Sequence, residues 1–435
     1  MLRPMPEALA SYLLVFGVLL IAATYLDRIS DRLKLPGVVL VLLLGLLADN
    51  NLSALPGETP PLLSLANAAD VAQVAVGVVL FHAGLGTNWR EFRGVLRPGL
   101  RLALIGSLIT AWLLMLVIHA LPVESLTSVS PGWGPALFIG AMVCSTDASA
   151  TLATLRPVAA RLPKRLLDLL ECESGINDPV AVVLAQLGLV LAAGALQAPA
   201  LDPSATGPGA EWLQEAPRLL TQVIRQFGLG AIIGTLVGSV AARLLEQRSD
   251  ALHHQEQQHR AVLALAVIFL LLGSTRLLGG SDLLAAFIAG LVIGNSPEMQ
   301  EQRLDLEQAT GSYLKLAELL LFLCMGLVVD PVDVLLVLPW TLLLFVLMQL
   351  MRLVAVVPLL QGAFTPQEQL FVGFCGLRGA VPIALAIGAA AHPTIGPGWG
   401  QHMPPLALGV VLLGLLLQGS LLVPFARRLR LVQQS

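Results

Sequence analysis

Charged residues are scarce in this chain. Asp, Glu, Lys and Arg make up only 12% of its 435 residues, whereas soluble domains carry about 25%. This shortage excludes an ordinary water-soluble domain. The net charge of −3 says little about partners, because the charges are sorted by side of the membrane; we expect no nucleic acid to bind.

Cysteines are scarce as well, and a cleavable signal is missing. Cys144, Cys172, Cys324 and Cys375 all fall inside apolar runs, and their spacing fits neither a disulfide framework nor a metal-binding motif. We therefore expect no cofactor and no metal beyond a transported ion. The first apolar run, 9–26, lacks a small-residue cleavage site, which favours a membrane span over a removable signal.

Apolar runs fill the rest of the chain, and 56% of all residues are hydrophobic. Because a run of roughly 20 apolar residues is long enough to cross a bilayer as a helix, the sequence predicts an all-α polytopic membrane protein. We place thirteen spans, at about 9–27, 36–52, 64–86, 100–121, 133–154, 168–195, 219–243, 259–278, 282–296, 312–329, 334–360, 368–391 and 405–426.

Positive residues are distributed unevenly around these spans. With the N-terminus outside and the C-terminus inside, all but seven of the 25 Lys and Arg residues lie on the cytoplasmic side. Such an asymmetry is what the positive-inside rule predicts for a correct set of spans. The seven others are Arg3, Arg218 and Arg276 on the opposite side, and Arg225, Lys315, Arg352 and Arg378 within spans.

Two parts of the chain are faintly similar to each other. The segment 80–85 in the third span has a counterpart at 321–327 in the tenth, and 145–147 in the fifth has one at 376–379 in the twelfth. Because equivalent spans are seven apart, an odd number, the two repeats are expected to be inverted and to contain two interrupted helices, as in many secondary transporters. The sequence therefore predicts one transmembrane domain over 1–435 without a soluble regulatory domain, divided into repeat one (about 9–195), a linking span (about 219–243) and repeat two (about 259–426).

Two aspartates lie inside the predicted spans. Asp147 is surrounded by small and hydroxylated residues, and Asp178 belongs to the sequence Asn177-Asp178-Pro179. An ionised carboxylate at the centre of a membrane helix costs about 2.5–3.5 kcal/mol or more, so each needs a cavity or a partner. The carboxylate oxygens of these two aspartates suit a monovalent cation or a proton. Hydrogen bonds from Asn177 would hold a neighbouring unwound backbone in place or fix the position of Asp147. The alternatives are a polar helix-packing seam for Asp147 and an interfacial position for Asp178.

Arg378 is the single arginine of the twelfth span, where two glycines and a proline predict a broken helix. A buried arginine stays protonated and needs an acid. Glu173 is the preferred partner and Glu171 the next, so we interpret Glu173–Arg378 as a structural ion pair. Lys315 and Glu318 are likewise spaced to pair on one face of the tenth span.

His82 is the only histidine inside a span. We favour a structural histidine over a proton sensor, and both interpretations remain open.

Five segments together resemble the monovalent cation:proton antiporter family, in its NhaP-like branch of sodium/proton or potassium/proton antiporters of the cell-volume-regulation type. They are Leu80-Phe81-His82-Ala83-Gly84-Leu85, Ser145-Thr146-Asp147-Ala148, Glu171-Cys172-Glu173-Ser174-Gly175-Ile176-Asn177-Asp178-Pro179, Gly279-Gly280-Ser281-Asp282-Leu283-Leu284-Ala285 with Gly294-Asn295, and Gly376-Leu377-Arg378-Gly379-Ala380-Val381-Pro382.

The resemblance implies an inverted-repeat antiporter in the cell membrane, usually a homodimer, in which a six-helix core moves against a dimerisation domain. By match, Asp178 would bind the cation and the proton in competition. Asp147, Thr146 and Ser174 would complete or organise the site. Asn177, where electrogenic relatives carry an acid, implies electroneutral exchange of one Na⁺ or K⁺ for one H⁺.

The Glu173–Arg378 pair matches the structural ion bridge of that family, but two features of the chain depart from the pattern. His82 stands where relatives often carry an acid, and we expect none of the cytosolic regulatory domains that are frequent in the potassium/proton branch. The residues thus leave the choice of cation open. A cation channel or channel-like sensor is the alternative function, although an inverted repeat argues against a symmetric pore. No enzymatic activity is expected, since an intramembrane aspartyl protease would need far fewer spans.

Overall fold

The structure is a computed structural model that describes residues 7–33, 36–48, 63–121, 132–197, 210–246, 253–300, 302–393 and 398–432. All regular elements within these ranges are helices. In this part of the chain, nine helical segments are long and apolar enough to cross a membrane, and three shorter apolar helices accompany them. The predicted all-α membrane architecture is confirmed, while thirteen spans with the N-terminus outside remain a prediction.

Each range that the sequence assigns to a span holds helical structure in the described residues. The helices are α1 (Glu7–Leu33), α2 (Gly37–Leu47), α3 (Leu65–Gly86), α4 and α5 (Leu96–Leu100 and Ser107–Ala120, joined by a π-helical turn), α6 and α7 (Trp133–Cys144 and Ala148–Leu155), α8 (Lys164–Gln197), α9 (Ala210–Glu246), α10 (His253–Leu277), α11 (Asp282–Asn295), α12 (Arg303–Val328), α13 and α14 (Pro331–Leu336 and Leu338–Leu360), α15 and α16 (Pro366–Phe374 and Ala380–Ala391), and α17 and α18 (Met403–Leu413 and Gly419–Arg428, joined by a π-helical turn).

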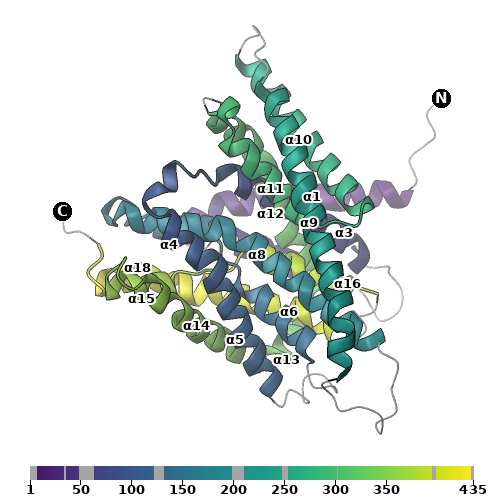
Figure 1. Cartoon of the computed structure of the whole chain (residues 1–435). Coiled ribbons are helices and arrows are strands. Elements are labelled where there is room, and N and C mark those ends of the chain that lie inside the picture. The colour runs from purple at the N-terminus through teal and green to yellow at the C-terminus, as the bar shows by residue number, and fades with distance from the viewer. Residues whose placement is uncertain are drawn as a thin grey trace.

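Helix α8 packs against helices from both halves of the chain. It crosses the middle of the bundle (Figure 1) and packs against α6 from the first half and against α11 and α16 from the second. The helix continues through Pro179, so the missing N–H at this position does not end it. The Asn-Asp pair therefore lies inside a continuous helix with neighbours from both halves.

Glycines allow several helices to approach closely. A methyl group at Gly84 of α3 or at Gly290 of α11 would overlap the backbone of the facing helix, and Gly45 of α2 lies in the same way against Gly326 of α12. Lipid removes most of the hydrophobic driving force between membrane helices, so close van der Waals contact along small residues holds them together. Helices α2, α3, α11 and α12 thus form one tightly packed group.

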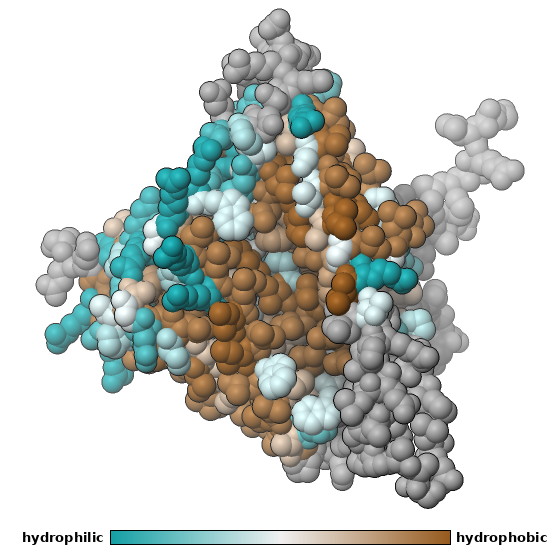
Figure 2. All heavy atoms as spheres, in the orientation of Figure 1, coloured by the Kyte–Doolittle hydropathy of each residue, from teal (hydrophilic) through white to brown (hydrophobic). Residues whose placement is uncertain are grey.

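The surface matches a position in a membrane. Figure 2 shows a broad hydrophobic area over the middle of the molecule and hydrophilic residues gathered along one edge, on the side where the C-terminus lies in Figure 1. Exposed side chains along α1 and α9, such as Leu14, Ile21 and Leu236, are large and apolar. An apolar surface with a polar rim is the pattern that lipid contact requires.

Candidate functional site

The two interrupted helices meet at their breaks. The first break separates α6 from α7 at 145–147, and the second separates α15 from α16 at 375–379. The backbone N–H of Asp147 donates to the carbonyl of Leu377 at 2.8 Å, and the hydroxyl of Thr151 donates to the carbonyl of Cys375 at 3.1 Å. Both predicted breaks are confirmed, and the tertiary structure joins them.

Two side chains, one within the break and one from α17–α18, satisfy carbonyl groups that the second break leaves free. Arg378 Nη1 donates to the carbonyl of Gly376 at 2.7 Å, and Gln418 Nε2 donates to the carbonyls of Gly376 and Phe374. Backbone polar groups in the hydrocarbon layer need partners inside the protein, so these contacts explain how an unwound segment persists. Sequence reasoning missed Gln418, whose only signal was a polar residue within an apolar run.

Asp147 lies at the starts of two helices. It is the N-cap residue of α7, where its Oδ1 accepts from the backbone N–H of Ala150 at 2.9 Å and from the hydroxyl of Ser149 at 2.6 Å. Its carboxylate also touches Gly379, the residue before α16, since a methyl group there would overlap it. The partial positive charge at helix N-termini favours an anion at this place. Helix starts and hydrogen bonds therefore accommodate Asp147 at the crossing, and no salt bridge to it is found among the residues that the structure describes.

Asp178 faces the first break from α8. Its Oδ1 accepts from the hydroxyl of Ser145 at 2.6 Å, and Asp147 lies within electrostatic range. Both acids are half-buried, and among the described residues each is hydrogen-bonded through Oδ1 only. Two neighbouring carboxylates that each keep one oxygen free offer ligands for a cation or a proton, as intramembrane acids on ion paths do.

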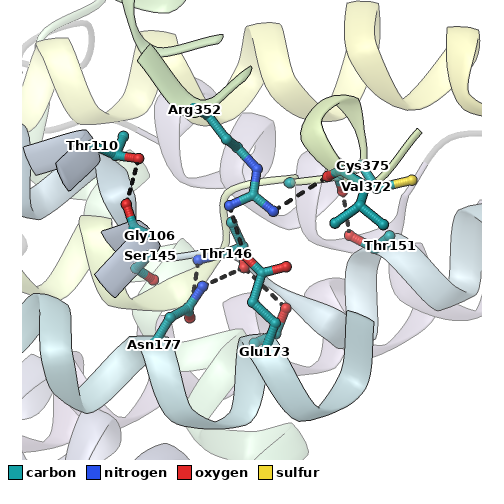
Figure 3. Close-up of polar contacts among 12 residues, drawn as sticks. Gly106, Thr110, Ser145, Thr146, Thr151, Glu173, Asn177, Arg352, Val372 and Cys375 are labelled. Carbon is teal, nitrogen blue, oxygen red and sulfur yellow. Dashed lines mark hydrogen bonds and ion pairs between the residues drawn. The ribbon is translucent and has the colours of Figure 1, made fainter. Parts of the chain in front are cut away.

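Asn177 clamps the unwound backbone beside the acids. Its side-chain Nδ2 donates to Thr146 Oγ1 at 2.5 Å, while the backbone N–H of Thr146 donates to Asn177 Oδ1 at 3.3 Å (Figure 3). The hydroxyls of Thr146 and Ser174 lie 3.0 Å apart. Asn177 is completely buried, so it holds the break in place while the two acids stay partly accessible.

The predicted Glu173–Arg378 ion pair is wrong. Glu173 Oε1 instead lies 2.8 Å from Arg352 Nη1, with side chains only 2% and 5% exposed. Figure 3 shows Arg352 pointing across the site toward Glu173, whereas Arg378 donates to the carbonyl of Gly376 and to Met348 Sδ at 3.1 Å. The physical reason is the break itself, which turns Arg378 onto its own backbone.

Arg352 is the second residue that sequence reasoning missed. It was counted among the four basic residues within spans but was given no role. Its isolation in α14, a helix of 23 residues, was the available signal, because a charge inside a membrane helix marks a partner or a function.

A membrane bundle in which two interrupted helices cross beside a pair of acids defines a class, the secondary transporters. Within this class, the chain belongs to the sodium/hydrogen exchanger family: the model of the transmembrane region of these exchangers matches residues 17–428.

Individual relatives agree with this assignment. The chain is 30% identical to the K(+)/H(+) antiporter NhaP2 of Shewanella sp. strain MR-4, over 97% of this chain and 67% of that protein. It is also 30% identical to the K(+)/H(+) antiporter NhaP of Alkalimonas amylolytica, over 98% and 68%. Identity to the Na(+)/H(+) antiporter NhaS2 of Synechocystis sp. is 25%, over 96% and 71%. None of these relatives supports the channel alternative.

The fold is shared with a solved structure. The sodium proton antiporter MjNhaP1 from Methanocaldococcus jannaschii, at pH 8, superimposes with a TM-score of 0.76 over 98% of this chain and 100% of that one, at 19% identity. At this identity the match shows the fold alone. It agrees with the all-helical architecture reached from the sequence.

Proposed function

We propose that this protein is a secondary active antiporter of the cell membrane that exchanges a monovalent cation, Na⁺ or K⁺, for H⁺. Asp178 binds the two ions in competition, and Asp147, Thr146, Ser174 and Asn177 complete or organise the site. The observation that carries this proposal is the crossing of the two breaks beside the half-buried Asp147 and Asp178, each of which is hydrogen-bonded through only one carboxylate oxygen among the described residues. The activities named for the relatives, K⁺/H⁺ and Na⁺/H⁺ antiport, support the pair of exchanged ions.

Competition at one acid explains why exchange occurs rather than leak. The carboxylate of Asp178 is neutral when protonated and is compensated when it holds a monovalent cation. The bare carboxylate is neither, and an uncompensated charge is costly in hydrocarbon. Only the two loaded forms therefore cross, and each cycle returns one ion for the other.

Electroneutral exchange follows from the residue before Asp178. Asn177 has no charge, and its side chain is committed to Thr146. It therefore provides no second proton site beside Asp178. One cation then exchanges for one proton, and the membrane potential does not drive the cycle.

The proposal includes the movement that carries the bound ion across the membrane. The chain works as a homodimer, in which a core with the crossed helices moves against a dimerisation domain. Large apolar side chains on the outer faces of α1 and α9 support contact with lipid or with a second copy. This assignment of the two bodies rests on the resemblance described above.

Inside-out vesicles with an acid interior test the proposal. A pH-sensitive dye reports proton release when K⁺, Na⁺ or Li⁺ is added separately. We expect at least one of these cations to release protons, and we expect Asp178→Asn to abolish the response without loss of folded protein.

Asp168→Asn is the matched control, because it makes the same substitution on the same helix, in another half-buried acid. It should respond like the unaltered protein. Cation-dependent proton flux that persists in Asp178→Asn would contradict the assignment of Asp178. A response to a change in membrane potential would contradict one-for-one exchange.

A further inference from the structure

Glu318 of α12 is an acid that makes no hydrogen bond or ion pair with any side chain in the described part of the chain. The sequence predicts a pair with Lys315, one turn earlier on the same helix. This prediction is wrong, because Lys315 Nζ instead donates to Asp27 Oδ1 of α1 at 2.9 Å. Among the described residues, no hydrogen bond or ion pair joins Glu318 to another group. The structure thus turns the expected counter-charge away from Glu318 and toward another helix.

Glu318 lies deep in the membrane-spanning part of α12. At 1.5 Å per residue, it is about 9 Å along the axis from residue 312, where the sequence places the start of this span, and about 15 Å from Val328. Its neighbours Ala317 and Leu319 are buried, whereas Glu318 itself is half-buried. An unpaired carboxylate at this depth is expected only where it lines a water-filled space or serves an ion.

The charged groups around Glu318 define what it faces. Asp147 at the crossing, Lys315 one turn earlier on α12 and Asp27 on α1 all lie within electrostatic range of Glu318. Helix α12 packs against α16, whose first residue follows Gly379 at the Asp147 carboxylate. The acid on α12 and the acid at the crossing therefore border the same region from two different helices.

We propose that Glu318 is a further cation-binding residue, which holds the ion on the path between water and the two aspartates. This inference rests on the proposed antiport function and adds a residue that sets cation affinity. A carboxylate opposite Asp147 attracts a cation and replaces part of its hydration shell before it reaches Asp178. Lys315 tunes this attraction, since its positive charge opposes a cation bound at Glu318.

Two substitutions with opposite charge effects test the proposal. Glu318→Gln removes the negative charge at nearly constant shape, and we expect the half-saturating cation concentration to rise about tenfold with the maximal rate within about twofold. Lys315→Gln removes the opposing positive charge and should lower the half-saturating concentration about threefold. Asp305→Asn, an exposed acid on the same helix, is the matched control and should leave both quantities unchanged.

The measurements are proton flux in reconstituted vesicles and, separately, cation-dependent thermal protection of the purified protein with K⁺, Na⁺ and Li⁺. An unchanged half-saturating concentration in Glu318→Gln overturns the inference. The same direction of change in Glu318→Gln and Lys315→Gln overturns it too, because a general structural defect shifts both alike.

Binding measured directly separates this inference from the proposed function. If the unaltered protein shows no exchange but cations protect it against thermal unfolding, and Glu318→Gln weakens this protection, the antiport proposal fails while the proposed cation binding by Glu318 stands. If the unaltered protein exchanges ions and Glu318→Gln changes neither the flux nor the thermal protection, the proposed role of Glu318 is refuted and the antiport proposal stands. Absence of both exchange and protection in the unaltered protein overturns both.

Discussion

The ion pair between Glu173 and Arg352 gives a quantitative test of the structure. The two side chains are almost fully enclosed and 2.8 Å apart, and Arg378 lies within electrostatic range as a second buried cation. Glu173→Gln removes the negative charge and leaves two positive ones in the same apolar surroundings. Loss of one partner of a buried pair costs about 3–5 kcal/mol. At roughly 1–2 °C per kcal/mol for a chain of this size, the melting temperature should fall by about 3–10 °C.

A double-mutant cycle separates the true partner from the one that the sequence suggests. We expect Glu173→Gln and Arg352→Gln to be coupled by about 2 kcal/mol or more, because the double variant leaves no unpaired charge of this pair. The coupling between Glu173→Gln and Arg378→Gln should stay below about 1 kcal/mol, since no direct bond joins these side chains.

Thermal unfolding of the purified protein in detergent, followed by the loss of the monodisperse fraction, measures all five variants. The melting temperature of the conservative variant Arg352→Lys should lie between those of the unaltered protein and Arg352→Gln, because lysine keeps the charge but not the planar fork of donors. A stronger coupling of Glu173 to Arg378 than to Arg352 would refute the geometry and restore the pair suggested by the sequence.

Three further predictions concern the site. Gly379→Ala, just before α16, should reduce the rate of exchange more than tenfold because the new methyl group overlaps the Asp147 carboxylate. Gly388→Ala within α16 has open space around it and should leave the rate unchanged. Equal rates for the two variants in the vesicle assay would contradict this prediction. Ser145→Ala removes the hydroxyl that donates to Asp178 Oδ1 at 2.6 Å, a bond to a charged acceptor worth about 1.5–3 kcal/mol, so at fixed pH the half-saturating cation concentration should rise roughly tenfold. His82→Gln keeps a polar group near Thr310 Oγ1, which lies 3.2 Å from His82 Nδ1, so the pH profile of exchange should stay in place; a displaced profile would favour the proton sensor.

Much of the fold follows from local features of the sequence. Length and apolar composition decide that a segment spans a membrane, and glycines and prolines around Arg378 predict the break between α15 and α16. The acids Asp147 and Asp178 are conspicuous because a carboxylate in an apolar run is costly. Each of these arguments needs only a residue and its close neighbours in the chain.

The partners of the charged residues do not follow in this way. The sequence suggests Glu173 for Arg378 because a buried arginine stays protonated and needs an acid, and it suggests Lys315 for Glu318 because helical spacing permits the contact. The structure pairs Glu173 with Arg352 and Lys315 with Asp27. In both cases the partner lies on a helix far away in the sequence, where spacing gives no information.

The sequence by itself determined the class of architecture, the two breaks and the acids at the site, since the free energy of placing apolar or charged residues in lipid depends on the residues themselves. Only the tertiary structure decided which breaks cross, which arginine neutralises Glu173, and that Lys315 pairs with Asp27 rather than with Glu318. Hydrogen bonds and ion pairs act over a few ångströms and depend on direction, so they are settled when helices from both halves of the chain pack together.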